Sequence, residues 1–174
     1  HPRVNILNPG PGVGGHCIPC DPHYLLWQLR KEHIMLPLIE QAMSEIAVRP
    51  RRVVERVREE LADRGLPLAG ARVLVAGVAY KPDVADLRES PALEILSLLQ
   101  QAGASVAFHD PHFTQLRLRD GSVLAGTSDP LDFDPDIVVL HTAHSSVDQS
   151  WLSEAPMVLD TTYRGADLPQ RVLL

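Results

Sequence analysis

A glycine- and proline-rich run near the start of the chain constrains its local fold more than any other feature. The segment Pro9–Gly15 contains four glycines and two prolines, which disfavour both helix and strand. We therefore expect a tight loop whose backbone a ligand can approach closely, because glycine leaves main-chain amides open to anionic groups. This loop leads directly to Cys17 and Asp21, two side chains suited to chemistry.

A helix is predicted to follow the loop. Asp21 has the residue type of an N-cap and Pro22 that of a first helical residue, so the helix is expected over 22–31. Its apolar stripe consists of Leu25, Leu26 and Leu29. Cys17 is then expected just before the helix N-terminus, where the helix dipole favours the thiolate, the reactive form of a cysteine nucleophile.

Three other interpretations of the same residues are open. Cys17 and Cys20 form a CxxC sequence like that of thiol-disulfide oxidoreductases, although no strand long enough to precede it lies upstream of Pro9. The second is a zinc site, because histidine and cysteine are common zinc ligands. Its ligands are expected to be His16, Cys17, Cys20 and His23, a span that is short for tetrahedral geometry. The third is a pair of structural cysteines on an incidental loop.

Two blocks of sequence resemble signatures of one enzyme family. Residues 12–21 read GVGGHCIPCD, which resembles the G-x-G-G-x-C-x-x-x-D loop of the UDP-glucose/GDP-mannose dehydrogenase family. Residues 77–91 read GVAYKPDVADLRESP, which resembles the same family's G-x-A-[FY]-K-x-x-x-x-D-x-R-x-S-P signature. The longer opening HPRVNILNPGPGVGGHCI is similar to the branch that acts on UDP-N-acetyl-D-mannosamine, with UDP-N-acetylglucosamine and UDP-glucose as alternative substrates.

The resemblance implies oxidation of the C6 alcohol of a UDP-sugar to a carboxylate in two hydride steps, with NAD as the oxidant. Cys17 is the implied nucleophile: it adds to the intermediate aldehyde, and loss of the second hydride leaves a thioester that water hydrolyses. Sulfur suits this role because it adds readily to an aldehyde and leaves readily as thiolate. Asp21 is the implied residue for positioning or activating that water, alongside its expected role as a helix cap.

The same resemblance implies the residues that bind the substrate. Lys81 is expected to contact the UDP phosphates, for which a point charge on a flexible stem is suited. The other implied substrate-binding residues are Arg3, which is lent to the neighbouring subunit's site, Val13, Gly14, Gly15, Tyr80 and Arg164. Arg164 stands in for a basic residue that many members carry two places after the aspartate of a late strand, where this chain has Asp160-Thr161-Thr162. No metal is expected.

The apolar pattern predicts a long broken helix after the catalytic loop and an α/β sheet after that. From Pro22 to about Gly65 the spacing is helical, with a break at Glu32–Leu36 and an expected kink or restart at Pro50. The strands are expected over 72–79, 106–109, 136–141 and 157–160, with a helix that begins at Ser90-Pro91 and stops at Gly103. This alternation indicates a Rossmann-like, doubly wound parallel sheet with ligands at the carboxyl ends of its strands.

The expected organisation is two units. Residues 1–66 are expected to form the catalytic cysteine loop and the central dimerisation helices, and residues 67–174 a C-terminal UDP-sugar-binding domain. The strand end at Gly77 lacks the G-x-G-x-x-G sequence that binds a dinucleotide. We therefore expect NAD to be bound mainly by an N-terminal domain absent from this chain, which by itself is expected to be inactive. Arg88 is expected near the cofactor pyrophosphate, or else paired with Asp83 or Glu89 at the surface.

Composition sets the remaining expectations. The chain has 174 residues, of which 45% are hydrophobic and 22% charged, and its net charge of −6 gives no indication of nucleic-acid or membrane binding. With two cysteines and no signal-peptide or membrane-spanning pattern, a cytoplasmic protein is expected. A homodimer through the central helix is the expected assembly. The rival function classes are a non-catalytic UDP-binding or dimerisation module and a zinc or redox protein built on Cys17 and Cys20.

Overall fold

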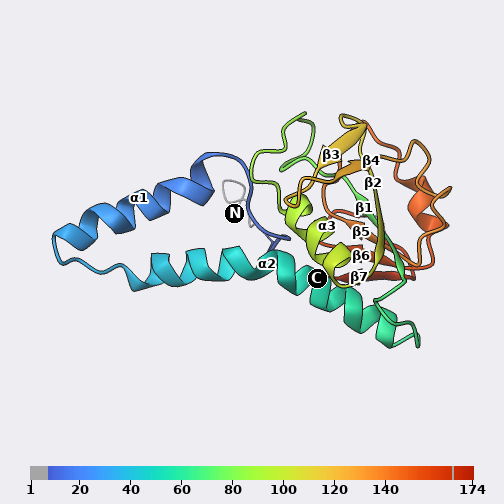
Figure 1. Ribbon diagram of the computed structural model, residues 1–174, viewed down its shortest axis with the longest axis horizontal. Coiled ribbons are helices and arrows are strands. Elements are labelled where there is room, and N and C mark those ends of the chain that lie inside the picture. Colours follow the sequence, from blue (N-terminus) through green and yellow to red (C-terminus); the bar gives the residue numbers. More distant parts are fainter. Residues whose placement is uncertain (1–7, 166) are drawn as a thin grey trace.

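The computed structural model describes residues 8–165 and 167–174 and shows a helical hairpin extending from an α/β domain (Figure 1). Helix α1 (Cys17–Lys31) runs outward, and α2 (Pro37–Ala62) returns and continues along the domain. The break predicted at Glu32–Leu36 is confirmed as the turn between them. An exposed ion pair between Arg30 and Glu40 joins the two helices next to this turn. The predicted substrate residue Arg3 lies outside the described residues.

Helix α1 begins earlier than predicted. Its first residue is Cys17, His16 occupies the N-cap position, and no side chain caps it. The prediction that Asp21 caps this helix is therefore wrong, because Asp21 lies in the second turn. The prolines permit the longer helix, since the first four N–H groups of a helix have no intrahelical partner. Pro19 consequently removes no hydrogen bond, and Pro22 removes one close to the helix end.

Helix α2 passes through Pro50 as one helix of 26 residues, so the predicted restart there is wrong. Burial offsets the hydrogen bond that proline removes, because the part of α2 after Pro50 packs against the domain. Its buried residues are Val53, Val54, Val57 and Leu61. Next to Pro50, the Arg49 Nε donates a hydrogen bond of 2.8 Å to the carbonyl oxygen of Gly10, which ties the glycine-proline loop to the middle of α2.

The α/β domain is built on one parallel sheet, which confirms the predicted fold class. Its strands are β1 (Arg72–Ala76), β2 (Ser105–His109), β5 (Ile137–Leu140), β6 (Val158–Asp160) and β7 (Arg171–Leu173), in the order β2-β1-β5-β6-β7. Helix α3 (Pro91–Gln101) connects β1 to β2, with Ser90 as the predicted N-cap. The chain then returns past β1 to β5, so the winding direction reverses between these two strands. Crevices at such a reversal, outside the carboxyl ends of the strands, are the usual ligand sites of open α/β sheets.

Apolar side chains cover both faces of the sheet. Helices α2 and α3 pack on one face, in a cluster that includes Leu61, Ile95 and Phe108. A 3-10 helix, η1 (Ser150–Ser153), and its flanking loops cover the other face, with Leu152 fully buried. Strands buried on both faces have continuous apolar sequences, which is why the central strands are evident from the sequence.

The sequence does not indicate four of the smaller elements. These are η1, the edge strand β7 and the antiparallel hairpin of β3 (Gln115–Arg117) and β4 (Val123–Ala125). Each is only three or four residues long, too short for a hydrophobic period to be recognised. Among the described residues, every helix is too short or too polar to cross a membrane.

Candidate functional site

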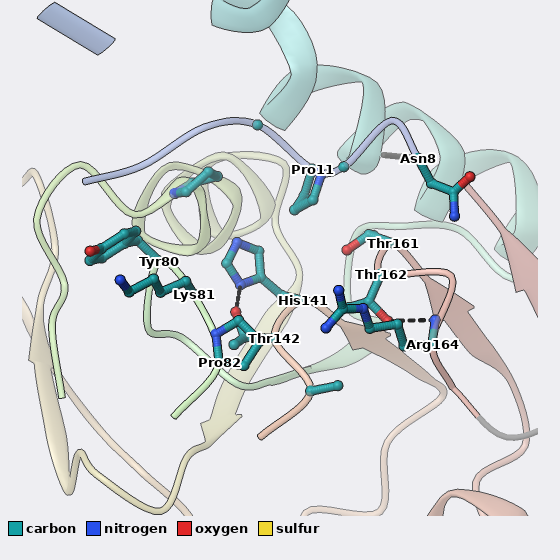
Figure 2. A pocket seen from close by; sticks show the side chains of 14 residues that line it. Asn8, Pro11, Tyr80, Lys81, Pro82, His141, Thr142, Thr161, Thr162 and Arg164 are labelled. Atoms are coloured by element: carbon teal, nitrogen blue, oxygen red, sulfur yellow. Dashed lines mark hydrogen bonds between the residues drawn. The ribbon is translucent and has the colours of Figure 1, made fainter. Parts of the chain in front are cut away.

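A pocket of about 400 Å³ lies at the carboxyl ends of β1, β5 and β6, where the winding of the sheet reverses (Figure 2). Side chains that closely follow these strands line it: Tyr80, Lys81 and Pro82 after β1, His141, Thr142 and Ala143 after β5, and Thr161, Thr162 and Arg164 after β6. Pro91 completes this side. The opposite wall is the glycine-proline loop, through Asn8, Gly10, Pro11 and Gly12. The pocket therefore combines two regions that are far apart in the sequence.

The loop reaches this pocket because its glycines allow it to pack directly on the domain. A Cβ atom on Gly14 would lie 2.6 Å from the Cβ of Tyr80 and 2.8 Å from the carbonyl oxygen of Glu89. A Cβ on Gly15, which has a φ of 86°, would lie 2.9 Å from the Tyr80 ring. The Gly15 amide also donates to the carbonyl of Arg88 at 2.8 Å, so this amide binds the loop to the domain and is not available to a ligand.

Two cationic side chains lie on either side of the pocket. Lys81 is next to Tyr80, with its Nζ 5.4 Å from the ring centroid, and Arg164 lies across the pocket (Figure 2). Among the described residues, neither of these cations forms a salt bridge. Unpaired cations at a pocket are suited to phosphate groups. The structure thus brings together three of the predicted substrate residues, Tyr80, Lys81 and Arg164, whereas Val13, Gly14 and Gly15 lie beside the pocket and do not line it.

The loop that carries Arg164 is shaped by a buried carboxylate. Asp160, at the end of β6, accepts hydrogen bonds from the backbone amides of Thr162 and Gly165 at 2.7 and 2.9 Å. Its Oδ2 also accepts two from the guanidinium of Arg171 on β7, at 2.7 and 3.0 Å. Burial acts to raise the pKa of this carboxyl, but the hydrogen bonds from Thr162, Gly165 and Arg171 outweigh it and hold the pKa below the usual range.

The loop that carries Lys81 is held by a second buried carboxylate and a histidine. Asp110 follows β2, and its Oδ2 accepts the amides of Val78 and Ala79 at 2.6 and 3.3 Å. The same oxygen lies 3.2 Å from Nε2 of His144, whose Nδ1 accepts the amide of Asp83 at 3.0 Å. Sequence reasoning gives His144 no role, because these partners lie 34 and 61 residues away along the chain.

His141 lies in the pocket with its two nitrogen atoms in different situations. Nδ1 is 2.9 Å from the Thr142 hydroxyl, which itself donates to the carbonyl of Ala79 at 2.7 Å. Since a hydroxyl has one proton, Nδ1 is the protonated nitrogen of the neutral ring. Nε2 is buried and has no hydrogen-bond partner among the described residues. Burial lowers the pKa of His141 to about 4, so the ring is neutral at pH 7.

Arg88 forms a bidentate ion pair with Asp86, in which Nη2 donates to Oδ2 at 2.6 Å and Nε to Oδ1 at 3.1 Å. The predicted surface pairing with Asp83 or Glu89 is therefore wrong. Side-chain hydrogen bonds between the two groups raise the pKa of Arg88 and lower that of Asp86. The pair is adjacent to the point where the glycine-proline loop contacts the domain, because the Arg88 carbonyl is the acceptor for Gly15.

Cys17 and Asp21 occupy one face of α1, because residues four apart on a helix are neighbours. Both are exposed, and neither lines the pocket around Lys81. Cys17 and Cys20 are free thiols. Within the part of the chain that the structure describes, no group of three or more histidine, cysteine, aspartate or glutamate side chains could hold a metal ion. His16, Cys17, Cys20 and His23 therefore do not form the zinc site weighed from the sequence.

Two family profiles match the chain. Residues 74–164 match the UDP-glucose/GDP-mannose dehydrogenase family, UDP binding domain, and residues 1–45 match the central domain of the same family. The first match covers most of the sheet, without β7, and the loops after β1, β5 and β6 that line the pocket, and the second covers the glycine-proline loop and α1.

Similar proteins come from bacteria and archaea. The chain is 40% identical over 120 residues to a UDP-N-acetyl-D-mannosamine dehydrogenase of Campylobacter jejuni, and the aligned region covers 68% of this chain and 28% of that protein. It is 36% identical over 145 residues to an NDP-N-acetyl-D-galactosaminuronic acid dehydrogenase of Ralstonia solanacearum, and this alignment covers 83% of this chain and 33% of the relative. The structure of a UDP-D-ManNAc dehydrogenase from Pyrococcus horikoshii superimposes with a TM-score of 0.79 at 27% identity, over 99% of this chain and 40% of that one.

Proposed function

Because this chain belongs to the UDP-glucose/GDP-mannose dehydrogenase family, we propose that it is the part of a nucleotide-sugar dehydrogenase that binds the UDP moiety and supplies the catalytic cysteine. The chain spans about a quarter to two fifths of the length of the relatives it matches, so the activity of the whole enzyme is part of this proposal. UDP-N-acetyl-D-mannosamine is the proposed substrate, with UDP-N-acetylglucosamine and UDP-glucose as alternatives.

The observation that carries the proposal is the pocket at the switch point of the sheet, with two cations that form no salt bridge with other described residues. Lys81 and Arg164 lie on opposite sides of it, an arrangement suited to a diphosphate. The volume of about 400 Å³ is within the range of small-molecule sites. The proposed UDP site is therefore this pocket, with Tyr80 packed beside Lys81.

We propose that Cys17 is the nucleophile of the second oxidation. The thiolate adds to the C6 aldehyde and forms a carbon–sulfur bond, and loss of a hydride from that carbon gives a thioester. Asp21, one turn along the same face of α1, positions the water that releases the carboxylate and the Cys17 thiolate. The exposure of both side chains is compatible with a substrate that enters from outside this chain.

NAD supplies the hydride acceptor in the proposed reaction, but the residues after β1 do not fit a dinucleotide site. The connection from β1 to α3 is a long loop with a single glycine, Gly77, which packs against Thr142. Ser90 and Pro91 occupy the helix N-terminus where a pyrophosphate would otherwise bind. The proposed NAD site lies in the portion of the relatives that this chain does not span, and Arg88 beside the loop is its proposed contact from this side.

The test is a calorimetric titration of the chain with UDP. We expect one-to-one binding that Lys81→Ala weakens about tenfold or more, because a charge-assisted phosphate contact is lost. The matched control is Lys31→Ala, since Lys31 is the chain's only other lysine and lies on α1 over Trp27. Absence of UDP binding, or equal effects of both variants, contradicts the proposed site.

The catalytic part is tested in the longer enzyme that contains this chain. Cys17→Ser is expected to abolish formation of the sugar acid, whereas Cys20→Ser is expected to preserve it. Undiminished acid formation by the Cys17 variant would leave a UDP-binding or dimerisation module as the better description. The chain alone is expected to produce no NADH.

A further inference from the structure

We propose that His144 is a positioning residue: by latching the loop between β1 and α3, it holds Lys81 in place for the diphosphate of the nucleotide. The inference rests on the function proposed above. It concerns a residue that lies outside the lining of the pocket and is almost fully buried, with 1% of its side chain exposed.

The loop is fastened on both sides of Lys81. Before it, the amides of Val78 and Ala79 bind Oδ2 of Asp110 at 2.6 and 3.3 Å. After it, the amide of Asp83 binds Nδ1 of His144 at 3.0 Å. A second hydrogen bond joins the same two loops, because Oδ1 of Asp83 accepts from the backbone amide of Ser145, the residue after His144, at 2.7 Å.

The imidazole of His144 links these two attachment points. Its Nδ1 faces a backbone N–H group, which can only donate, so Nδ1 must be the acceptor and the neutral ring carries its proton on Nε2. Nε2 then donates to Oδ2 of Asp110 at 3.2 Å. The His112 ring packs edge-on against the imidazole at a centroid distance of 4.9 Å, which fixes the plane of the ring. One buried side chain thus sets the separation between the two ends of the segment 78–83, which carries Lys81.

The segment needs such an attachment because its backbone is held in an unfavourable conformation. Asp83 has a φ of 62°, in the left-handed region that residues with a Cβ seldom adopt. Lys81 and Asp83 are both exposed, so little packing holds them. If the His144 bond is lost, the loop gains freedom that the ligand must then remove, and affinity falls by that entropic cost.

Replacing His144 is compatible with folding, because Asp110 keeps the amides of Val78, Ala79 and His112 as donors. Two conservative variants separate the two ring nitrogens. In His144→Asn the amide group takes the place of Nδ1 and can accept from Asp83. In His144→Gln it takes the place of Nε2 and keeps the contact with Asp110, but the latch on Asp83 is lost.

The experiment is a double-mutant cycle read by UDP titration. We expect His144→Gln to weaken UDP binding about fivefold and His144→Asn to stay within about twofold of the wild-type protein, as for loss or retention of one hydrogen bond. In the Lys81→Ala background, His144→Gln is expected to change the affinity by less than about twofold, because a residue that acts through Lys81 has nothing left to position. Additive losses, or identical effects of the Asn and Gln variants, would overturn the proposal.

Amide exchange and nitrogen NMR of the wild-type chain test the latch without any ligand or variant. The Asp83 amide is expected to be protected from exchange although its residue is exposed, and Nδ1 of His144 to be unprotonated. An unprotected amide or the opposite tautomer overturns the latch. If the wild-type chain binds no UDP, the proposed function itself fails and the positioning role fails with it, a result distinct from UDP binding that is indifferent to His144.

Discussion

The imidazole of His141 carries its proton on Nδ1, which donates to the Thr142 hydroxyl. Its Nε2 is buried without a hydrogen-bond partner among the described residues. Burial keeps this ring neutral, with its pKa lowered to about 4. As the pH falls, the unfolded chain therefore takes up a proton at this histidine near the ordinary pKa of about 6.5, whereas the folded chain takes it up only at lower pH. Folding is thus coupled to pH through one side chain at the candidate site.

The free energy of unfolding is expected to fall as the pH is lowered from about 6.5 to 4, by roughly 3 kcal/mol at most, because the unfolded state binds one more proton over that window. His141→Asn removes the titrating ring and keeps a donor for Thr142. The free energy of unfolding of this variant should therefore fall less between these pH values, by the contribution of His141. The measurement is urea unfolding at a series of pH values. His23→Asn, on the exposed surface of α1, is the matched control, and equal slopes in the wild-type protein and His141→Asn would contradict this account.

The family resemblance named Lys81 and Arg164 as substrate residues, and both line the pocket, although their contact with a substrate stays a prediction. The sequence did not indicate the bonds of His144 or the Arg88–Asp86 pair. A hydrogen bond depends on side-chain direction and on which strands are neighbours, and neither is determined locally.

At the scale of elements, the glycine-proline loop packs on the α/β domain and places the first residues of α1, which then runs outward. Gly14 lies against the Cβ of Tyr80 and the carbonyl of Glu89, both in the loop that follows β1. The start of α1 is therefore placed by close backbone contact with the loop that carries Lys81. The sequence predicted the irregular loop correctly, but the beginning of α1 was wrong by five residues, at Cys17 instead of Pro22.

Gly14→Ala is expected to destabilise the protein by about 1–3 kcal/mol, because the added methyl has no space between two backbone-anchored neighbours. Gly10→Ala is the matched control: a Cβ there would lie 3.8 Å from its nearest neighbour, the Gly12 carbonyl, an ordinary contact. The two variants are compared by thermal or urea unfolding. Equal stabilities would show that the loop does not depend on this close approach.

At the scale of the whole molecule, the helical hairpin presents apolar side chains that the described residues leave uncovered. No residue of α1 is buried. Tyr24, Trp27 and Leu38 are 70%, 62% and 85% exposed. Large exposed apolar surfaces of this kind mark interaction sites in soluble proteins. We propose that the homodimer expected from the sequence covers this surface.

The chain is expected to sediment as a dimer, and Trp27→Asp is expected to weaken the association about tenfold or more, because a charge replaces an aromatic side chain that the dimer would bury. Val123→Asp is the matched control, since Val123 is 58% exposed on the β3–β4 hairpin, outside α1 and α2. Analytical ultracentrifugation over a concentration series gives both values. A monomer at all concentrations, or equal weakening by both variants, would argue against the hairpin as the dimer surface.

The sequence by itself determined the irregular loop, the central strands, the Ser90 cap of α3 and the family, because each depends on residues close together in the chain. Turn residues, apolar runs and motifs are local signals. Only the tertiary structure decided that the loop around Gly12 and the ends of β1, β5 and β6 enclose one pocket. It also decided that Asp110, His144 and Asp160 shape the loops around it. Those contacts join residues from different strands, and strand order and side-chain direction arise only when the sheet is assembled.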